Sequence, residues 1–213
     1  MAEEVKEVIH DELNPTSEIL TMGEVIRNLN ELTEGNAIIV TDVGQHQMVA
    51  CRYAKFNKSK SNITSGGLGT MGFGLPAAIG AKFGAPDRQV ITIIGDGGFQ
   101  MTLQELGTIM QNEVDVKILI LNNQFLGMVR QWQQLFMDKR YSFVDIASPD
   151  YVTLAKAYRI EGQSVSKRED LHNALSTMLN HKGSYLLEVM VGKENNVFPM
   201  VPQGCSVSEI RLK

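Results

Sequence analysis

Two short polar motifs in this 213-residue chain contain side chains that could bind a metal ion and phosphate. The first is Asp96, which lies among the glycines of residues 95–98, and the second is the pair Asn122 and Asn123. Mg²⁺ in proteins is typically held by one or two carboxylates together with phosphate groups of a ligand. One Asp carboxylate, one Asn amide oxygen and a loop carbonyl would leave coordination positions for a diphosphate, which the glycines would allow to approach closely. Either motif alone is better explained as a turn or a helix cap, so the prediction depends on both.

Each motif follows a short apolar run that is typical of a buried strand. Residues 89–94 precede Asp96, and residues 116–121 lead into the asparagines. Residues 99–112, between the two strands, carry apolar side chains at helical spacing. A right-handed crossover makes two such strands parallel and brings their carboxyl ends to one edge of the sheet. Asp96 and Asn123 are therefore predicted to face each other, with the helix that starts near residue 99 directing its free N–H groups at the phosphates.

A third apolar run, residues 37–40, leads into the polar stretch 41–47, which contains Gln45 and His46. Three buried runs that end in polar or glycine-rich loops predict a doubly wound, mostly parallel α/β sheet with helices on both faces and one ligand crevice. His46 is a candidate ligand contact, with a surface or capping histidine as the equal alternative. Further helices are expected at residues 17–32, 47–55, 125–136, 151–158 and 169–179, and further strands at 159–161 and 185–191.

The two ends of the chain are expected to differ from its middle. Residues 1–16 are charged and end in a turn signal, so we interpret them as a leader or linker with little packing. Residues 17–213 are expected to form the binding domain, with an irregular tail after residue 198. Trp132 lies at helical spacing with apolar neighbours, which favours core packing, but its helix begins directly over the proposed site and holds the only tryptophan of the sequence.

Composition restricts the class of protein. Apolar residues make up 43% of the chain and charged residues 21%, as in an ordinary globular protein. A net charge of −4 gives no electrostatic argument for nucleic acid or an anionic membrane as a partner. No apolar run is long enough to span a bilayer, and the start of the chain lacks the pattern of a signal or transit peptide. Cys51 and Cys205 are isolated, which argues against disulfides or a zinc site and favours a cytoplasmic location.

A glycine pattern at Gly67, Gly69 and Gly72 matches the G-x-G-x-x-G fingerprint of dinucleotide sites. That fingerprint should follow a solid apolar strand, and residues 61–64 are a poor one. Its acidic partner should receive a ribose hydroxyl, whereas Asp96 lies inside its own glycine turn. A nicotinamide-binding enzyme is therefore only a minor alternative.

Taken together, the motifs resemble those of the thiamine-diphosphate enzymes. The stretch from Gly95 through Asp96 to the paired asparagines resembles their cofactor motif. The match is closer to the catalytic subunit of acetohydroxyacid (acetolactate) synthase, through residues 43–48, 64–72, 75–81, 127–132 and 198–202. The resemblance covers about residues 17–203 and identifies the chain with the C-terminal, thiamine-diphosphate-binding domain of that enzyme.

The resemblance implies a role for individual residues. Asp96 and Asn123 would be side-chain ligands of Mg²⁺, and Phe125 would supply a main-chain carbonyl. Gly69 would offer its carbonyl to the 4′-amino group of the cofactor, and Met71 would support the bend between its two rings. Trp132 would line the pocket that selects the second ketoacid. The full set of cofactor-binding residues implied is Gln45, His46, Gly69, Met71, Gly95, Asp96, Gly97, Gly98, Asn123, Gly127 and Met128.

Two positions depart from the pattern expected of this family. Val49 stands where a tryptophan is expected, and Gly98 where serine or alanine is expected. Because Gly98 keeps its backbone N–H, diphosphate binding should survive, although a hydroxyl contact would be lost.

Enzymes of this family are about three domains long, and this chain resembles only the last. The glutamate that protonates the aminopyrimidine belongs to the first domain, and Glu105 is better explained as part of a solvated helix face. No catalytic side chain is therefore assigned here, and the chain alone is expected to bind Mg²⁺ and the diphosphate half of the cofactor without turnover.

Expected partners are the N-terminal and middle domains of the enzyme, a second copy in a homodimer and a regulatory subunit. FAD would belong to the full-length enzyme. Surfaces that meet the other domains, including the small-residue helix from Gly72 to Gly80, are expected to be apolar and to promote dimerisation.

The favoured function is that of a transferase in branched-chain amino-acid biosynthesis. It would decarboxylate pyruvate on thiamine diphosphate and add the two-carbon unit to pyruvate or 2-oxobutyrate. One alternative keeps the cofactor but changes the chemistry, as in pyruvate oxidase or a carboligase. Another is a separate cofactor-binding subunit that is inactive until a partner brings the missing glutamate.

Overall fold

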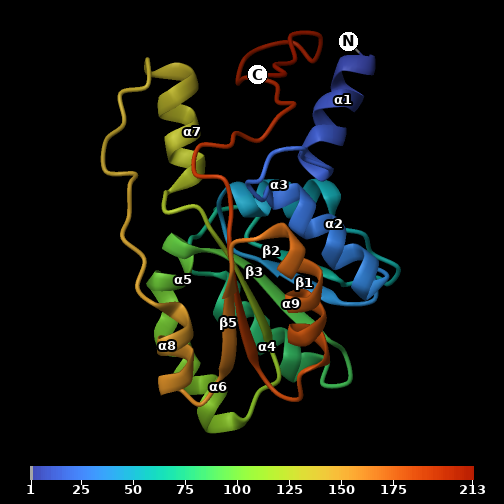
Figure 1. Ribbon diagram of the computed structural model, residues 1–213, viewed down its shortest axis with the longest axis vertical. Helices are drawn as coiled ribbons and strands as arrows, with labels where there is room; N and C mark the ends of the chain where they lie inside the picture. Colours follow the sequence, from blue (N-terminus) through green and yellow to red (C-terminus); the bar gives the residue numbers. More distant parts are fainter. Residues whose placement is uncertain (1) are drawn as a thin grey trace.

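Parallel strands form the centre of the computed structural model, which describes residues 2–213 (Figure 1). Within these residues the strands are β1 (Ile38–Thr41), β2 (Asn62–Thr64), β3 (Val90–Gly95), β4 (Lys117–Asn122), β5 (Glu161–Val165) and β6 (Tyr185–Met190). Their order across the sheet is β2-β1-β3-β4-β6-β5, and every neighbouring pair is parallel. The predicted doubly wound α/β fold is confirmed, with a sheet that is entirely parallel over the described strands.

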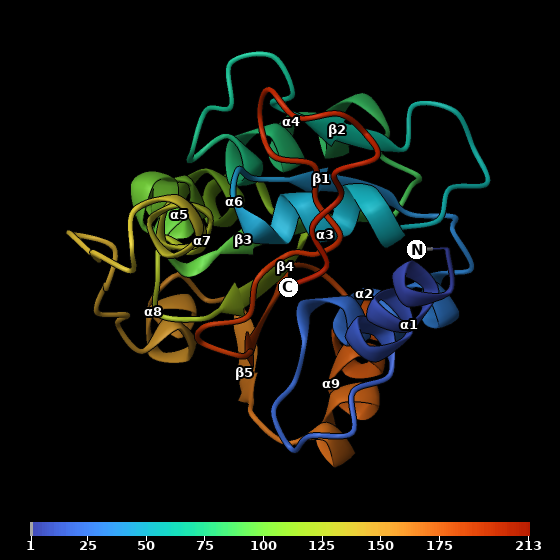
Figure 2. The ribbon, with the colours of Figure 1, turned by 90° about the horizontal axis from the view of Figure 1, so that it is seen from above.

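Successive side chains of a strand point to opposite faces of the sheet, so these strands contribute side chains to two separate cores. Ile39, Ile91 and Ile93 pack on one face against α2 (Met22–Thr33), α3 (Gln45–Tyr53) and α9 (Arg168–Asn180). Val40 and Ile94 pack on the other face against α4 (Gly74–Gly84), α5 (Asp96–Thr102), α6 (Leu106–Asn112) and α8 (Tyr151–Ala157). Figure 2 shows α2 and α9 on one side of the sheet and α4 on the other. Both faces are buried, which explains the uninterrupted apolar runs of β3 and β4.

The carboxyl ends of the strands lie toward the upper end of the molecule in Figure 1. Helix α7 (Gly127–Phe136), both chain termini and the tail after β6 gather there. The polar loops predicted to carry the site are therefore at one end of the fold.

Several element boundaries differ from those predicted. Residues 2–13 form a helix, α1 (Ala2–Leu13), that the sequence did not predict; none of its residues is buried. Helix α2 starts at Met22 rather than at residue 17, and Thr21 is its N-cap. The helix predicted from residue 99 begins at Asp96 and is interrupted by a 3-10 turn, η1 (Leu103–Glu105). The poor strand at 61–64 does form the short edge strand β2, and β5 covers residues 161–165 rather than 159–161. The division into a leader and a domain stays a prediction.

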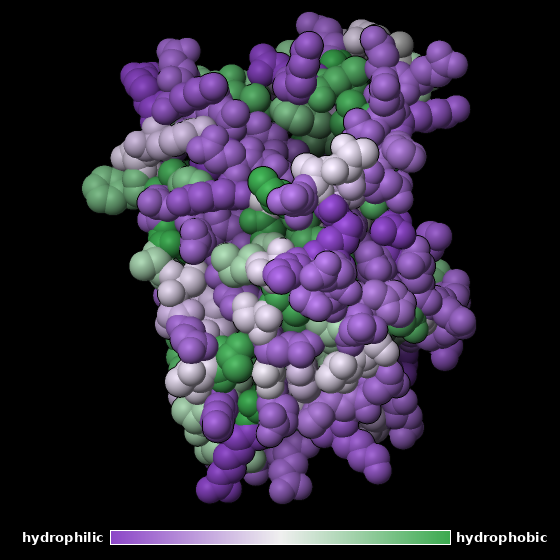
Figure 3. Space-filling model, in the orientation of Figure 1, coloured by the Kyte–Doolittle hydropathy of each residue, from purple (hydrophilic) through white to green (hydrophobic). Residues whose placement is uncertain are grey.

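The surface seen in Figure 3 is mostly hydrophilic, with apolar residues in small scattered groups. On α4 the exposed residues are Pro76, Gly80, Phe83 and Gly84, and Phe83 is 60% exposed. Dimerisation through this face stays a prediction. None of the helices within residues 2–213 combines the length and the apolar character needed to cross a bilayer. Cys51 and Cys205 are exposed and unpaired, as expected.

Candidate functional site

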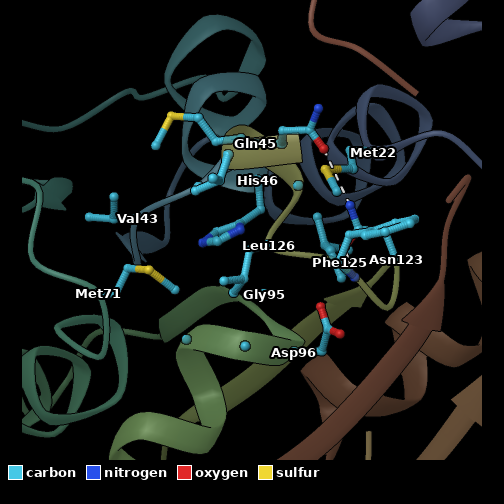
Figure 4. A pocket seen from close by; sticks show the side chains of 17 residues that line it. Met22, Val43, Gln45, His46, Met71, Gly95, Asp96, Asn123, Phe125 and Leu126 are labelled. Atoms are coloured by element: carbon cyan, nitrogen blue, oxygen red, sulfur yellow. Dashed lines mark hydrogen bonds between the residues drawn. The ribbon is translucent and has the colours of Figure 1, made fainter. Parts of the chain in front are cut away.

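A pocket lies at the carboxyl ends of β1, β3 and β4 (Figure 4). After β1 the chain continues to β2 at one edge of the sheet, and after β3 it continues to β4 on the other side. The loops after β1 and β3 therefore diverge, and open α/β sheets bind ligands at such a switch point. The empty space within the pocket, including the part open to solvent, is about 420 Å³. It is lined by Met22, Val43, Gly44, Gln45, His46, Met71, Gly95, Asp96, Gly97, Gly98, Leu121, Asn123, Phe125, Leu126, Gly127, Met128 and Val129.

Most of the site residues predicted from the sequence are therefore brought together in this pocket. Two are not among the lining residues. Gly69 lies in the loop before α4 with a φ of +62°, and Trp132 is 42% exposed on α7, where its ring packs on Phe136 at 5.0 Å. Core packing of Trp132 was the wrong interpretation. The sequence also did not single out Met22 and Leu126, which supply apolar parts of the wall.

Asp96 is the first residue of α5 and is only 1% exposed. Its Oδ2 accepts a hydrogen bond from Ser148 Oγ at 3.1 Å, whereas Oδ1 is buried without a partner among the described residues. Burial raises the pKa of the Asp96 carboxyl to about 6, and hydrogen bonds, first that of Ser148, oppose this rise. An unpaired buried carboxylate oxygen is costly, and a bound cation is the partner that best removes the cost.

Asn123 faces the same pocket from the loop after β4. Its Nδ2 donates to Gln45 Oε1 at 3.2 Å, and its Oδ1 accepts from the Phe125 N–H at 3.2 Å. Gln45 and Asn123 lie against Gly127, the first residue of α7. A Cβ at this position would overlap both Gln45 Oε1 and Asn123 Nδ2, so glycine is required there. Asn122 turns the other way and donates to a glutamate of β6 at 2.7 Å. Only the second asparagine belongs to the pocket.

His46 lies in the first turn of α3 with its ring directed into the pocket, beside Met71 and Leu126 (Figure 4). It is 5% exposed, so it is not the surface histidine that the sequence left as an alternative. Burial lowers its pKa to about 4, and the nearby Asp42 carboxylate opposes this shift. The ring is therefore neutral at physiological pH, and its buried Nε2 is unpaired within residues 2–213. That nitrogen is available to a ligand.

Asp42, which the sequence analysis did not single out, holds the loop that carries Met71. It is fully buried, and its Oδ1 accepts from the N–H groups of Val43 at 2.7 Å and Gly72 at 3.1 Å. Its Oδ2 accepts from the Gly74 N–H at 2.8 Å. The position of Asp42 directly after a buried strand could have marked it as a candidate. The sequence does not show its role, however, because the loop that it holds lies 30 residues further along the chain.

The same carboxylate explains the glycine at position 98. A Cβ there would lie 2.5 Å from Asp42 Oδ1. The alanine or serine expected from the resemblance could enter only if Asp42 moved. Val49, the other residue that differs from the family pattern, is buried in the core that α2 and α3 share.

The opposite pKa shifts of Asp96 and His46 predict opposite pH dependences of stability. The pKa of Asp96 is raised in the folded state, so its contribution to the free energy of unfolding falls as pH rises from about 4 to 6. The pKa of His46 is lowered, so its contribution falls as pH drops from about 6.5 to 4. Each change amounts to roughly 3 kcal/mol, and the two act in opposite directions in the native chain. Urea titrations without metal measure the free energy of unfolding of the wild type and of His46→Gln. The difference, wild type minus variant, should increase by about 3 kcal/mol as the pH rises from about 4 to 6.5. Parallel profiles for the two proteins would contradict the shift assigned to His46.

Comparison with known proteins identifies the chain. Residues 42–189 match the family described as thiamine pyrophosphate enzyme, C-terminal TPP binding domain. The chain belongs to this family. The TPP-binding domain is 46% identical over 190 residues to the large subunit of acetolactate synthase isozyme 2 from Escherichia coli. It is 47% identical over 198 residues to the mitochondrial acetolactate synthase of Schizosaccharomyces pombe, and 43% over 197 residues to the large subunit from Lactococcus lactis.

These alignments cover most of the chain but only part of each relative. They include 89%, 92% and 92% of this chain, against 35%, 30% and 34% of the three relatives. The TPP-binding domain thus spans about a third of the length of the curated relatives it matches.

The pocket of this TPP-binding domain fits a diphosphate accompanied by a divalent cation. Asp96 Oδ1 and His46 Nε2 are buried polar atoms without protein partners in the described chain, and glycines line the space between them. Residues 2–213 contain no cluster of three or more His, Cys, Asp or Glu side chains that could hold a metal. A cation here would therefore need amide and carbonyl oxygens and the ligand's own phosphates, which is how Mg²⁺ is usually bound beside a phosphate.

Proposed function

We propose that this pocket binds thiamine diphosphate through Mg²⁺, with the Asp96 and Asn123 side chains and the Phe125 carbonyl as protein ligands of the metal. The observation that carries the proposal is the buried, unpaired Oδ1 of Asp96 in the pocket that Asn123 also lines. The Asn123 amide is oriented by its hydrogen bond to Gln45, so its oxygen is not free to exchange places with its nitrogen. That oxygen accepts one hydrogen bond and keeps a second lone pair for a cation.

The remaining lining residues suit the other parts of the cofactor. Gln45, His46, Gly97, Gly98 and Met128 would contact the diphosphate and the thiazolium ring. Met71, held in place through Asp42, would support the bend of the cofactor, and the Gly69 carbonyl would accept a hydrogen bond from its amino group. When bound, thiamine diphosphate supplies the carbon nucleophile that attacks a 2-oxoacid. The protein residues bind and orient it, and the neutral His46 can donate or accept one hydrogen bond.

The reaction that we propose for the complete enzyme is acetolactate synthesis, a transferase reaction on 2-oxoacids in branched-chain amino-acid biosynthesis. Three relatives named acetolactate synthase share 43–47% identity with the domain over nearly its whole length. Trp132, exposed on the helix that leaves the pocket, would contact the second ketoacid. FAD, a homodimer partner, a regulatory subunit and a cytoplasmic location stay predictions.

The chain alone is expected to bind the cofactor without turning over substrate. It spans about a third of its relatives, and none of the described pocket residues is a glutamate. Glu105, the alternative considered from sequence, lies on η1 outside the pocket lining.

Calorimetry on the 213-residue chain tests the proposal. Thiamine diphosphate should bind when Mg²⁺ is present and lose that binding in EDTA, while NADH should give no signal under either condition. Binding that ignores Mg²⁺, or an NADH signal in place of a thiamine diphosphate signal, would contradict the proposed site. Acetolactate formation by this chain alone would contradict only the expected lack of turnover.

A further inference from the structure

The irregular segment between α7 and α8 contacts the proposed metal site at two places. The backbone of residues 144–146 pairs antiparallel with residues 124–126, through N–H···O bonds of 2.8 and 3.1 Å. The residues on either side of Phe125 make these bonds, so the N–H and C=O of Phe125 itself point away from the paired segment. The Phe125 N–H donates to Asn123 Oδ1 on that other side. The segment thus fixes the loop that would carry two of the metal ligands.

The second contact is made by Ser148. Its hydroxyl donates to Asp96 Oδ2 at 3.1 Å and leaves Oδ1 as the buried, unpaired oxygen. The neighbouring Tyr151 donates from its own hydroxyl to the backbone carbonyl of Asp96 at 3.1 Å. Tyr151 is fully buried, and its ring packs edge-on against Phe99 at 5.3 Å. Ser148 is therefore held next to a rigid anchor, although it lies in a segment without regular structure.

We propose that Ser148 is a positioning residue for the metal site: its hydroxyl holds one oxygen of Asp96 and so directs the other at the cation. The inference rests on the proposed function, because it assumes that Asp96 is a metal ligand. The observation behind it is the hydrogen bond to Asp96 Oδ2 together with the unpaired Oδ1.

The reason that a single hydroxyl can matter lies in the coordination geometry. Mg²⁺ requires nearly octahedral coordination and takes one oxygen from a carboxylate, whereas Ca²⁺ accepts bidentate carboxylates and irregular geometry. Without Ser148, the Asp96 carboxylate loses the side-chain donor that holds Oδ2, and it can turn so that both oxygens face the cation. Loss of Ser148 should therefore weaken Mg²⁺ more than Ca²⁺. General loosening of the fold would weaken both cations alike.

The test compares cation affinities of the 213-residue chain at saturating thiamine diphosphate, measured by calorimetry with Mg²⁺ and with Ca²⁺. Ser148→Ala is expected to lower the Mg²⁺ affinity by roughly 10- to 100-fold, as commonly happens when a residue that hydrogen-bonds a metal ligand is replaced. The ratio of Mg²⁺ to Ca²⁺ affinity should fall, because only Mg²⁺ demands the fixed oxygen. Ser148→Thr, which keeps the hydroxyl, should retain the wild-type ratio.

Ser142→Ala is the matched control, because Ser142 is exposed in the same segment and is hydrogen-bonded through its backbone. If Ser148→Ala fails to fold, Ser148→Cys, of similar size but with a weaker donor, replaces it in the same comparison. Wild-type cation affinities in Ser148→Ala, or an equal loss for both cations, would overturn the role of Ser148 and leave the proposed function intact. A wild-type chain whose cofactor binding does not depend on Mg²⁺ would overturn the proposed function itself, and this inference with it.

Discussion

Asp96→Asn is expected to abolish Mg²⁺-dependent binding of thiamine diphosphate and, at the same time, to stabilise the metal-free chain. The charge and the unpaired Oδ1 of Asp96 are what the pocket offers a cation, and the amide removes the charge. Without a cation, that same charge is buried, as the rise of its pKa to about 6 indicates. At neutral pH the substitution should raise the free energy of unfolding by roughly 3 kcal/mol. Calorimetry measures the first effect and urea denaturation in EDTA the second.

A suitable control is Asp145→Asn. Asp145 lies close by in the segment that pairs with Phe125, but its side chain is 71% exposed and forms an ion pair with Lys193. Its replacement should leave cofactor binding intact and change stability little, because exposed ion pairs contribute about 1 kcal/mol or less. Undiminished Mg²⁺-dependent binding by Asp96→Asn would rule Asp96 out as a ligand. A lower stability in EDTA would show that its buried charge is not a burden to the fold.

The second large effect is expected from Asp42→Ala. This substitution removes the acceptor of three backbone N–H groups, those of Val43, Gly72 and Gly74. Each of the three buried donors left without a partner costs roughly 1–3 kcal/mol, so we expect a loss of at least about 3 kcal/mol in the free energy of unfolding. The loop that carries Met71 should then open locally, and its amide protons should exchange faster.

Hydrogen exchange at the Gly72 and Gly74 amides is the most direct measurement, together with urea denaturation. Asp42→Asn keeps one carbonyl oxygen and should lose only part of this stability, which gives a measurable variant if the alanine protein does not fold. A loss below about 1 kcal/mol for Asp42→Ala would mean that water replaces the carboxylate at little cost, which would contradict its proposed role in holding the loop.

Features that depend on local pattern were predictable from the sequence. The strands that became β1, β3, β4 and β6 are buried on both faces, so their apolar runs are continuous and unambiguous. Asp96 and Asn123 follow directly from the ends of two of these strands. Strand β2 was underestimated because an edge strand of one exposed and two half-buried residues has no such run.

Features that depend on distant contacts were not predictable. The break at η1 leaves the helical spacing of apolar residues unchanged, so the pattern gave no sign of it. Ser148 reaches Asp96 across 52 positions of sequence, and nothing in its neighbourhood distinguishes it from another loop serine. Trp132 was misjudged because a stripe of apolar residues on a helix looks the same whether it faces a core or open surface.

The two cores on opposite faces of the sheet give the pocket a mechanical consequence. His46 belongs to α3, which packs in one core, while Asp96 begins α5, which packs in the other. A molecule that contacted both side chains would link the helix layer on one face of the sheet to the layer on the other face. Substitutions that leave a small cavity in either layer, even far from the bound molecule, should therefore weaken its binding.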